Sequence, residues 1–151
     1  MSKVELTNMV MIVDRESNRV LVQERTKSPE GITFPGGHVE QGESIVDSAV
    51  REVREETGLE VKNLKHCGVI HWCNTDSNER YLAFLYRTSD YSGKLSQNAR
   101  EGRVFWAEME KLESMELSEN FQECLPVFLV ENYSEGFSQW NSSQQNPMEY
   151  R

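Results

Sequence analysis

Three glutamates stand close together near the middle of the chain. Glu52, Glu55 and Glu56 have the spacing i, i+3 and i+4, which places their carboxylates on one side of a helix, near enough to repel one another. Proteins usually stabilise such a cluster with a hard divalent cation that prefers oxygen ligands. The spacing therefore favours a metal site, and a solvated acidic helix face is the alternative for three glutamates taken alone.

The residues around the glutamates strengthen the metal interpretation. Upstream, Pro35-Gly36-Gly37 lets the backbone come close to a ligand because two successive positions carry no side chain. From there the order is Gly37, five residues, Glu43, seven residues, and then the run Arg51-Glu52-Val53-Arg54-Glu55-Glu56-Thr57-Gly58-Leu59. A solvated acidic face would not require these flanking residues at fixed spacing.

Local signals predict a helix that carries the glutamates. Ser44 followed three residues later by Asp47 resembles a capping box, and Gly58 is the expected C-terminal stop after about Thr57. The glutamates lie roughly a quarter turn from the apolar stripe, so the helix can pack on a sheet while its acids face a cleft. That stripe consists of Val46, Ala49, Val50, Val53 and Thr57.

The remaining pattern predicts an α+β fold with a mixed β-sheet held between helices. Strands are expected at residues 4–13, 19–24, 32–34, 59–72, 81–86 and 103–107. A helix is expected at 120–131, a helical turn at 108–112 and a polar loop at 88–100. The strand at 81–86 is apolar on both faces, which predicts a central position.

Length and composition predict one domain and a tail. Residues 1–133 have the patterning of a folded domain, whereas residues 134–151 are polar and are expected to be loosely held or disordered. Trp140 within this tail could instead contact the body, a partner or a second copy, so a homodimer is left open.

Charge and cysteine content restrict the partners. A net charge of −9 argues against binding a nucleic-acid polymer, although a bound metal would still allow a nucleotide in one pocket. No apolar run approaches the length of a membrane span, and the N-terminus does not resemble a signal peptide. Three cysteines, an odd number, favour reduced thiols and a cytoplasmic protein.

The segment from Gly37 to Leu59 resembles the signature of the Nudix hydrolases at every fixed position. The resemblance implies an α/β/α sandwich and Mg²⁺-dependent hydrolysis, with Mn²⁺ as a possible substitute, of a nucleoside diphosphate linked to another group. It implies that Glu52, Glu55 and Glu56 bind the metal together with the carbonyl of Gly36. Arg51 then orients a motif glutamate and Glu43 supports the loop; which residue acts as general base is left open.

Outside the signature, the chain is most similar to the MutT-type subgroup, which hydrolyses oxidised nucleotides such as 8-oxo-dGTP. Glu101 before Gly102 resembles an acid that adds a ligand or base in that subgroup, with a loop acid outside the site as the alternative, and Arg25 could reach a phosphate. The expected reaction converts a nucleoside triphosphate to a monophosphate and pyrophosphate. The alternatives are a dinucleoside polyphosphate, ADP-ribose or sugar-nucleotide hydrolase, and a non-catalytic nucleotide sensor.

Further pocket residues follow from the same hypothesis. Gly37 and His38 are expected near the phosphates, with an exposed loop position as the alternative for His38, and Asn120 is expected at the base-binding end. Trp72, Phe34 and Phe121 could stack on a base, with burial in the core as the favoured alternative for each. Cys67, His71 and Cys73 share one face of a predicted strand and could suggest zinc, but their spacing matches no standard zinc pattern.

Overall fold

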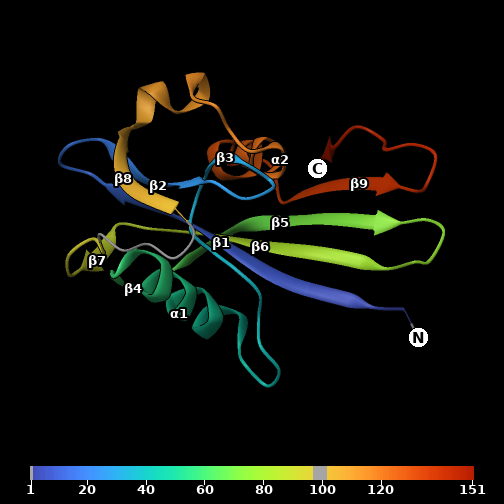
Figure 1. The fold of residues 1–151 in the computed structure, drawn as a ribbon, viewed down its shortest axis with the longest axis horizontal. Helices are drawn as coiled ribbons and strands as arrows, with labels where there is room; N and C mark the ends of the chain where they lie inside the picture. The colour runs from blue at the N-terminus through green and yellow to red at the C-terminus, as the bar shows by residue number, and fades with distance from the viewer. Residues whose placement is uncertain (1, 97–101) are drawn as a thin grey trace.

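The computed structural model describes residues 2–96 and 102–151, which form an α/β/α sandwich (Figure 1). Helix α1 (Ile45–Thr57) covers one face of a mixed sheet and helix α2 (Glu119–Leu129) covers the other. The α+β prediction is confirmed. The other elements are β1 (Val4–Asp14), β2 (Arg19–Arg25), β3 (Gly31–Thr33), β4 (Glu60–Lys62), β5 (Lys65–Asn74), β6 (Arg80–Thr88), β7 (Asp90–Ser92), β8 (Gly102–Glu108), the 3-10 helix η1 (Met109–Ser114), β9 (Glu135–Trp140) and β10 (Glu149–Tyr150).

The main sheet has the order β10-β9-β5-β6-β1-β2-β3, and β8 pairs with β2. β1 and β6 are parallel, as are β5 and β9, whereas the other pairs are antiparallel. β6 is central, as its apolar pattern predicted. β1 and β2 pair at only two positions, and Pro35–Gly37 then takes the place beside β1 through Val10 N–H to Pro35 O and Asn8 N–H to Gly37 O, each 2.9 Å. The sheet therefore splits where the signature begins.

Alternating side chains on the strands supply both layers of the core. Val10, Ile12 and Leu21 pack with α1, whereas Met11, Val20 and Val22 pack with α2. This is the period of two expected for a sheet covered on both faces. The same alternation determines whether a polar side chain of these strands lies on the α1 face or on the α2 face of the sheet.

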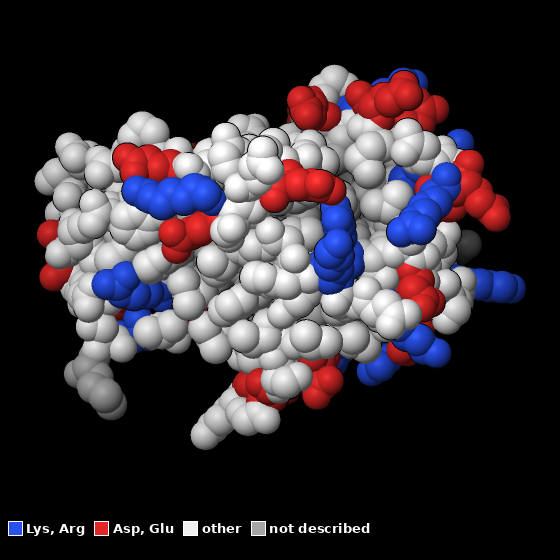
Figure 2. All heavy atoms as spheres, turned by 180° about the vertical axis from the view of Figure 1, so that it is seen from behind, with Lys and Arg blue, Asp and Glu red and all other residues white. Residues whose placement is uncertain are grey.

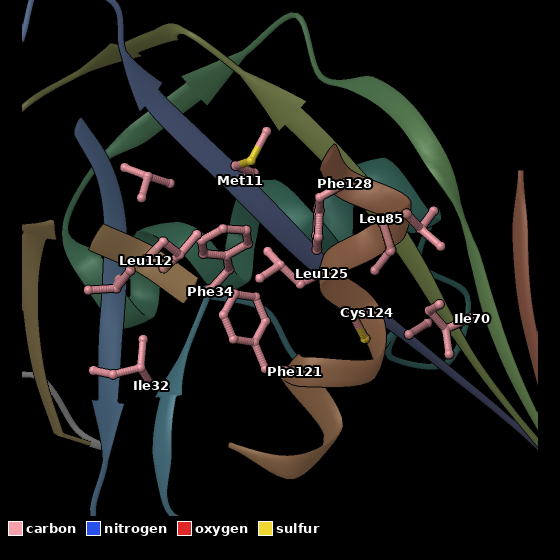
Figure 3. Close-up of a cluster of buried hydrophobic side chains, with 14 of the residues drawn as sticks. Met11, Ile32, Phe34, Ile70, Leu85, Leu112, Phe121, Cys124, Leu125 and Phe128 are labelled. Carbon is pink, nitrogen blue, oxygen red and sulfur yellow. The ribbon is translucent and has the colours of Figure 1, made fainter. Parts of the chain in front are cut away.

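On the α2 side, Phe34 is the centre of an aromatic cluster (Figure 3). Its ring lies edge-on to Phe121, with centroids 4.5 Å apart, and to Phe128 at 5.0 Å. Phe34 is buried, so the structure favours the core alternative over a stacking platform for a base. This packing holds α2 against the strand that leads into Pro35.

Helix α1 has the predicted ends. The Ser44 hydroxyl accepts a hydrogen bond from the Asp47 N–H at 2.9 Å, and Gly58 has φ of +84°, where a residue other than glycine would be strained. Ala49, Val53 and Thr57 of the predicted stripe are buried. The assignment of Val46 to that stripe was wrong, since Val46 is exposed near the first turn.

The C-terminal segment is not the loose tail that its composition predicted. Residues 135–140 form β9, which pairs in parallel with β5 from Val69↔Glu135 to Asn74↔Trp140. Gly136 and Ser138 are buried, and the Tyr150 hydroxyl donates a 2.6 Å hydrogen bond to the Glu123 carbonyl on α2. The prediction failed because a parallel partner distant in sequence supplies the order that local composition lacks.

Two smaller expectations were also incomplete. The strand predicted at 59–72 is two strands, β4 and β5, and β5 has an irregular register between His66 and Gly68. The loop predicted at 88–100 contains β7, which pairs with β4. Both misses involve β4 and β7, which have three residues each, and periodicity is a weak signal for strands this short.

Charged side chains of both signs are dispersed over the face opposite to that of Figure 1, with a broad uncharged area between them (Figure 2). Within the described ranges, neither helix is long and apolar enough to cross a bilayer. The three cysteines are all free.

Candidate active site

Arg51 connects the loop before α1 to the glutamates on it. Its Nε and Nη2 contact the two carboxylate oxygens of Glu43 at 2.8 and 3.0 Å, and its Nη1 lies 3.0 Å from Glu52 Oε1 and 3.2 Å from Glu55 Oε2. The hydrogen bond from Arg51 lowers the pKa of Glu43 to about 2, and the same contact raises the pKa of the Arg51 guanidinium. One cation thus compensates part of the repulsion within the cluster.

Glu56 is directed toward the backbone at the split in the sheet. It is only 5% exposed, and its Oε2 accepts a 3.1 Å hydrogen bond from the Gly36 N–H. Pro35 O and Gly37 O both point to β1, so the N–H and C=O of Gly36 point the opposite way in this extended segment. The Gly36 carbonyl therefore faces the same side as the Glu56 carboxylate.

Gly36 and Gly37 are required because the backbone here comes close to β1 and to the Glu52 carboxylate. A Cβ atom on Gly37 would lie 2.4 to 2.7 Å from the carboxylate atoms of Glu52, and one on Gly36 would lie 2.1 Å from Asn8 O. Asn8 also fixes this segment, since its Oδ1 accepts from the Gly37 N–H at 3.3 Å and its Nδ2 donates to Ser48 Oγ at 2.7 Å. A side chain at Gly37 would displace the Glu52 carboxylate, and one at Gly36 would push this segment away from the backbone of β1.

A pocket of about 420 Å³ opens at the split and connects the two faces of the sheet. Glu52 and Glu56 of α1 line one part of it, and Trp72 and Cys124, which belong to the α2 side, line another. A larger, open hollow of about 700 Å³ lies elsewhere, beside Arg15, Lys65 and Arg87, and none of the described motif glutamates lines it.

The structure brings together most of the side chains that the sequence singled out. Arg25, Gly36, Gly37 and His38 line the pocket with Glu52 and Glu56. Phe34, Trp72 and Asn120 line it as well. Arg51 and Glu55 are outside this lining: Arg51 lies behind the carboxylates, and the side chain of Glu55 is 38% exposed. Glu101 lies outside the described residues.

Sequence reasoning missed Asn8, Gln23 and Tyr81, which also line the pocket. Asn8 and Gln23 are buried polar residues, and each follows or precedes a buried apolar residue on the same strand face, Val10 for Asn8 and Leu21 for Gln23. A polar side chain at a buried strand position is the signal that could have identified both, because burial of a polar group is costly unless it serves a purpose.

The oxygen atoms at the pocket suit an open site for a hard cation such as Mg²⁺ better than a closed metal site formed by protein side chains alone. Among the described residues no three His, Cys, Asp or Glu side chains converge as they would in a closed metal site, so zinc at Cys67, His71 and Cys73 gains no support. Glu52, Glu56 and the Gly36 carbonyl supply oxygen atoms at one end of the pocket. Mg²⁺ typically binds through one or two carboxylates and keeps room for water and substrate phosphates.

Comparison with known families agrees with this geometry. The model of the NUDIX domain matches residues 5–128, most of the chain. The chain belongs to the Nudix family. As a Nudix hydrolase, it is a member of a family that cleaves the pyrophosphate bond of nucleoside diphosphate derivatives.

The names of the relatives do not assign one substrate to this chain. The Nudix hydrolase YvcI of Bacillus subtilis is 28% identical over 116 residues, covering 75% of this chain and 71% of YvcI. The NAD-capped RNA hydrolase NudC of Vibrio parahaemolyticus is 34% identical over 94 residues, which are 61% of this chain but only 34% of NudC. The MutT-type subgroup is thus not fixed by sequence similarity.

Among solved structures, a MutT protein from Bacillus halodurans superposes with a TM-score of 0.78 and covers 97% of both chains at 20% identity. At that identity the likeness establishes the fold. It extends over nearly the whole chain, beyond the residues matched by the family model.

Proposed function

We propose that this Nudix hydrolase is a Mg²⁺-dependent pyrophosphohydrolase that converts a nucleoside triphosphate, including an oxidised one such as 8-oxo-dGTP, to a monophosphate and pyrophosphate. The supporting observation is that one pocket joins the carboxylates of Glu52 and Glu56 to a wall containing Trp72 and Asn120. The carboxylate end suits a cation and phosphates, and the aromatic and amide end suits a base.

The chain's own residues have separable tasks in this proposal. Glu52, Glu55, Glu56 and the Gly36 carbonyl would hold the cation, which when bound would neutralise phosphate charge and help to align a water with phosphorus. Arg51 positions Glu52 and Glu55 through the contacts given above. Water adds to phosphorus, the bond to the leaving phosphate oxygen breaks, and a carboxylate of the cluster accepts the proton of the water.

A second candidate is a substrate with two nucleoside or sugar halves joined by a diphosphate. A cavity of about 140 Å³ shares Trp72 and Tyr81 with the main pocket and is also lined by Trp140. These aromatic side chains could hold a second ring, as the dinucleotide in the name of the NudC relative would require. Mn²⁺ is expected to replace Mg²⁺ in either reaction.

A product-resolved screen with Mg²⁺ and with Mn²⁺ decides between the candidates. It compares ordinary and 8-oxo nucleoside triphosphates with dinucleoside polyphosphates, ADP-ribose, NAD and sugar nucleotides. Preference for a triphosphate with release of pyrophosphate supports the first candidate. Preference for a diphosphate that joins two nucleoside or sugar halves supports the second candidate. Tight nucleotide binding without any product would contradict both candidates.

Replacing Glu56 with Gln tests the role of the cluster. Gln retains an acceptor for the Gly36 N–H but loses the negative charge, so the fold is expected to persist while activity falls at least ~100-fold, since charge stabilisation by a metal contributes several kcal/mol and 1.36 kcal/mol is tenfold. Glu131→Gln, at an exposed residue just after α2, is the matched control and should retain full activity. Near-normal turnover by Glu56→Gln would refute the assignment.

A further inference from the structure

Gln23 carries an unsatisfied donor at the wall of the active-site pocket. The residue is 1% exposed and lines the pocket, and its Nε2 has no hydrogen-bond partner among the described residues. Buried side-chain amides are nearly always paired, and leaving one unpaired destabilises the folded state. An unpaired amide at a binding pocket is therefore a candidate for a contact that the ligand completes.

The strand pattern shows which end of the pocket Gln23 faces. Leu21 packs in the α1 layer, whereas Val20 and Val22 pack in the α2 layer. Because side chains alternate along a strand, Gln23 and Arg25 share the α1 face with Leu21. This is the face on which Glu52 and Glu56 lie, and Trp72 belongs to the opposite layer.

The neighbouring strands do not use the Gln23 donor. Thr33 on β3 and Val104 on β8 are the positions opposite Gln23. The Thr33 hydroxyl donates to the Phe34 carbonyl at 3.2 Å, and Val104 has no polar side-chain atom. The side chains that flank Gln23 across the sheet therefore leave its Nε2 available to a molecule in the pocket.

We propose that Gln23 is a substrate-binding residue whose side-chain amide donates a hydrogen bond to a non-bridging phosphate oxygen of the nucleotide. The inference rests on the proposed function for the pocket but assigns a contact that function does not include. A neutral donor adds no charge to a pocket that Glu52 and Glu56 also line, so it does not compete with a cation for their carboxylates. Gln23 lies two residues farther along β2 toward the core than Arg25.

A contact of this kind predicts opposite effects on stability and on binding. Gln23→Met keeps a similar volume and removes the unpaired amide, so the free protein should melt at a higher temperature than wild type. The same change should raise KM with little effect on kcat if the hydrogen bond is equally strong in substrate and transition state. A residue that merely packs would not produce this combination.

The experiment measures binding without turnover. The probes for isothermal titration are inorganic pyrophosphate and α,β-methylene-dGTP, each with Mg²⁺. The proteins compared are wild type, Gln23→Met and Gln23→Asn. The Asn variant retains the amide but is one methylene shorter. Both variants should bind both probes roughly ten- to a hundredfold more weakly, the cost of one hydrogen bond to a charged group. Gln139→Met, an exposed glutamine on β9, is the matched control and should change neither affinity nor melting temperature.

The outcomes separate this inference from the function on which it rests. Unchanged affinity of Gln23→Met for both probes overturns it, and weaker binding of the nucleotide analogue alone would move the contact to the base and overturn the phosphate assignment. If wild type turns over no nucleotide in the substrate screen, the proposed function fails, whereas the pyrophosphate titration still decides whether Gln23 contacts phosphate.

Discussion

At the scale of single residues, Arg51 allows three acids to share one helix face before any cation arrives. Its bidentate contact with Glu43 leaves Nη1 free to contact both Glu52 and Glu55. Planar, bidentate pairing of this kind is specific to arginine, so Arg51→Lys should not replace it. The geometry of the acidic cluster thus depends on a residue that does not line the pocket.

The Glu43–Arg51 pair predicts a dependence of stability on pH. The pKa of Glu43 is lowered from 4.5 to about 2, so its ionised form contributes stability that is complete above pH 4.5 and is lost as the pH falls toward 2. Glu43→Gln should therefore be less stable than wild type at pH 7, with a difference that shrinks between pH 4.5 and pH 2. Urea midpoints of both proteins across this range measure it.

Glu40→Gln is the control for that series. The Glu40 side chain is largely exposed and lies 3.6 Å from Arg51 Nη1, so removing its charge should change the urea midpoint little. The backbone N–H of Glu40, which donates to Glu43, is retained in this variant. A constant difference between wild type and Glu43→Gln at every pH would show that the carboxylate charge is not what the pair contributes.

At the scale of elements, α1 depends on its ends. The Ser44 hydroxyl satisfies a backbone donor of the first turn, so Ser44→Ala is expected to lower the free energy of unfolding by about 1 kcal/mol, whereas Ser44→Asp should retain the wild-type value. Chemical denaturation of the three proteins measures both effects. Equal loss in the Ala and Asp variants would show that another property of Ser44 matters.

The elements also show what sequence could and could not predict. Helix α1 and the position of its motif glutamates were predictable because caps, apolar stripe and signature all lie within about 20 residues. β9 and the pairing of β4 with β7 depend on partners that are distant in the chain, which local periodicity does not report. The pocket role of Asn8 and Gln23 depends on the split between β1 and β2, a property of the assembled sheet.

At the scale of the whole molecule, the C-terminal segment completes the sheet that holds Trp72. β9 covers the edge of β5, and Tyr150 on β10 stacks on Tyr133 with ring centroids 5.3 Å apart. Truncation to residues 1–133 would leave β5 as an exposed edge strand, which lowers stability and favours aggregation. The truncated chain is expected to melt at a lower temperature than the full chain and to elute partly as aggregates in size-exclusion chromatography.

Tyr150→Phe provides a milder version of the same test. It removes only the hydrogen bond from the Tyr150 hydroxyl to the Glu123 carbonyl and should lower the free energy of unfolding by about 1 kcal/mol without aggregation. If the segment were an appendage to a domain ending near Tyr133, both proteins would melt like the full chain. A lowered melting temperature in both, larger for the truncation, would instead make β9 and β10 part of the unit that folds around the candidate active site.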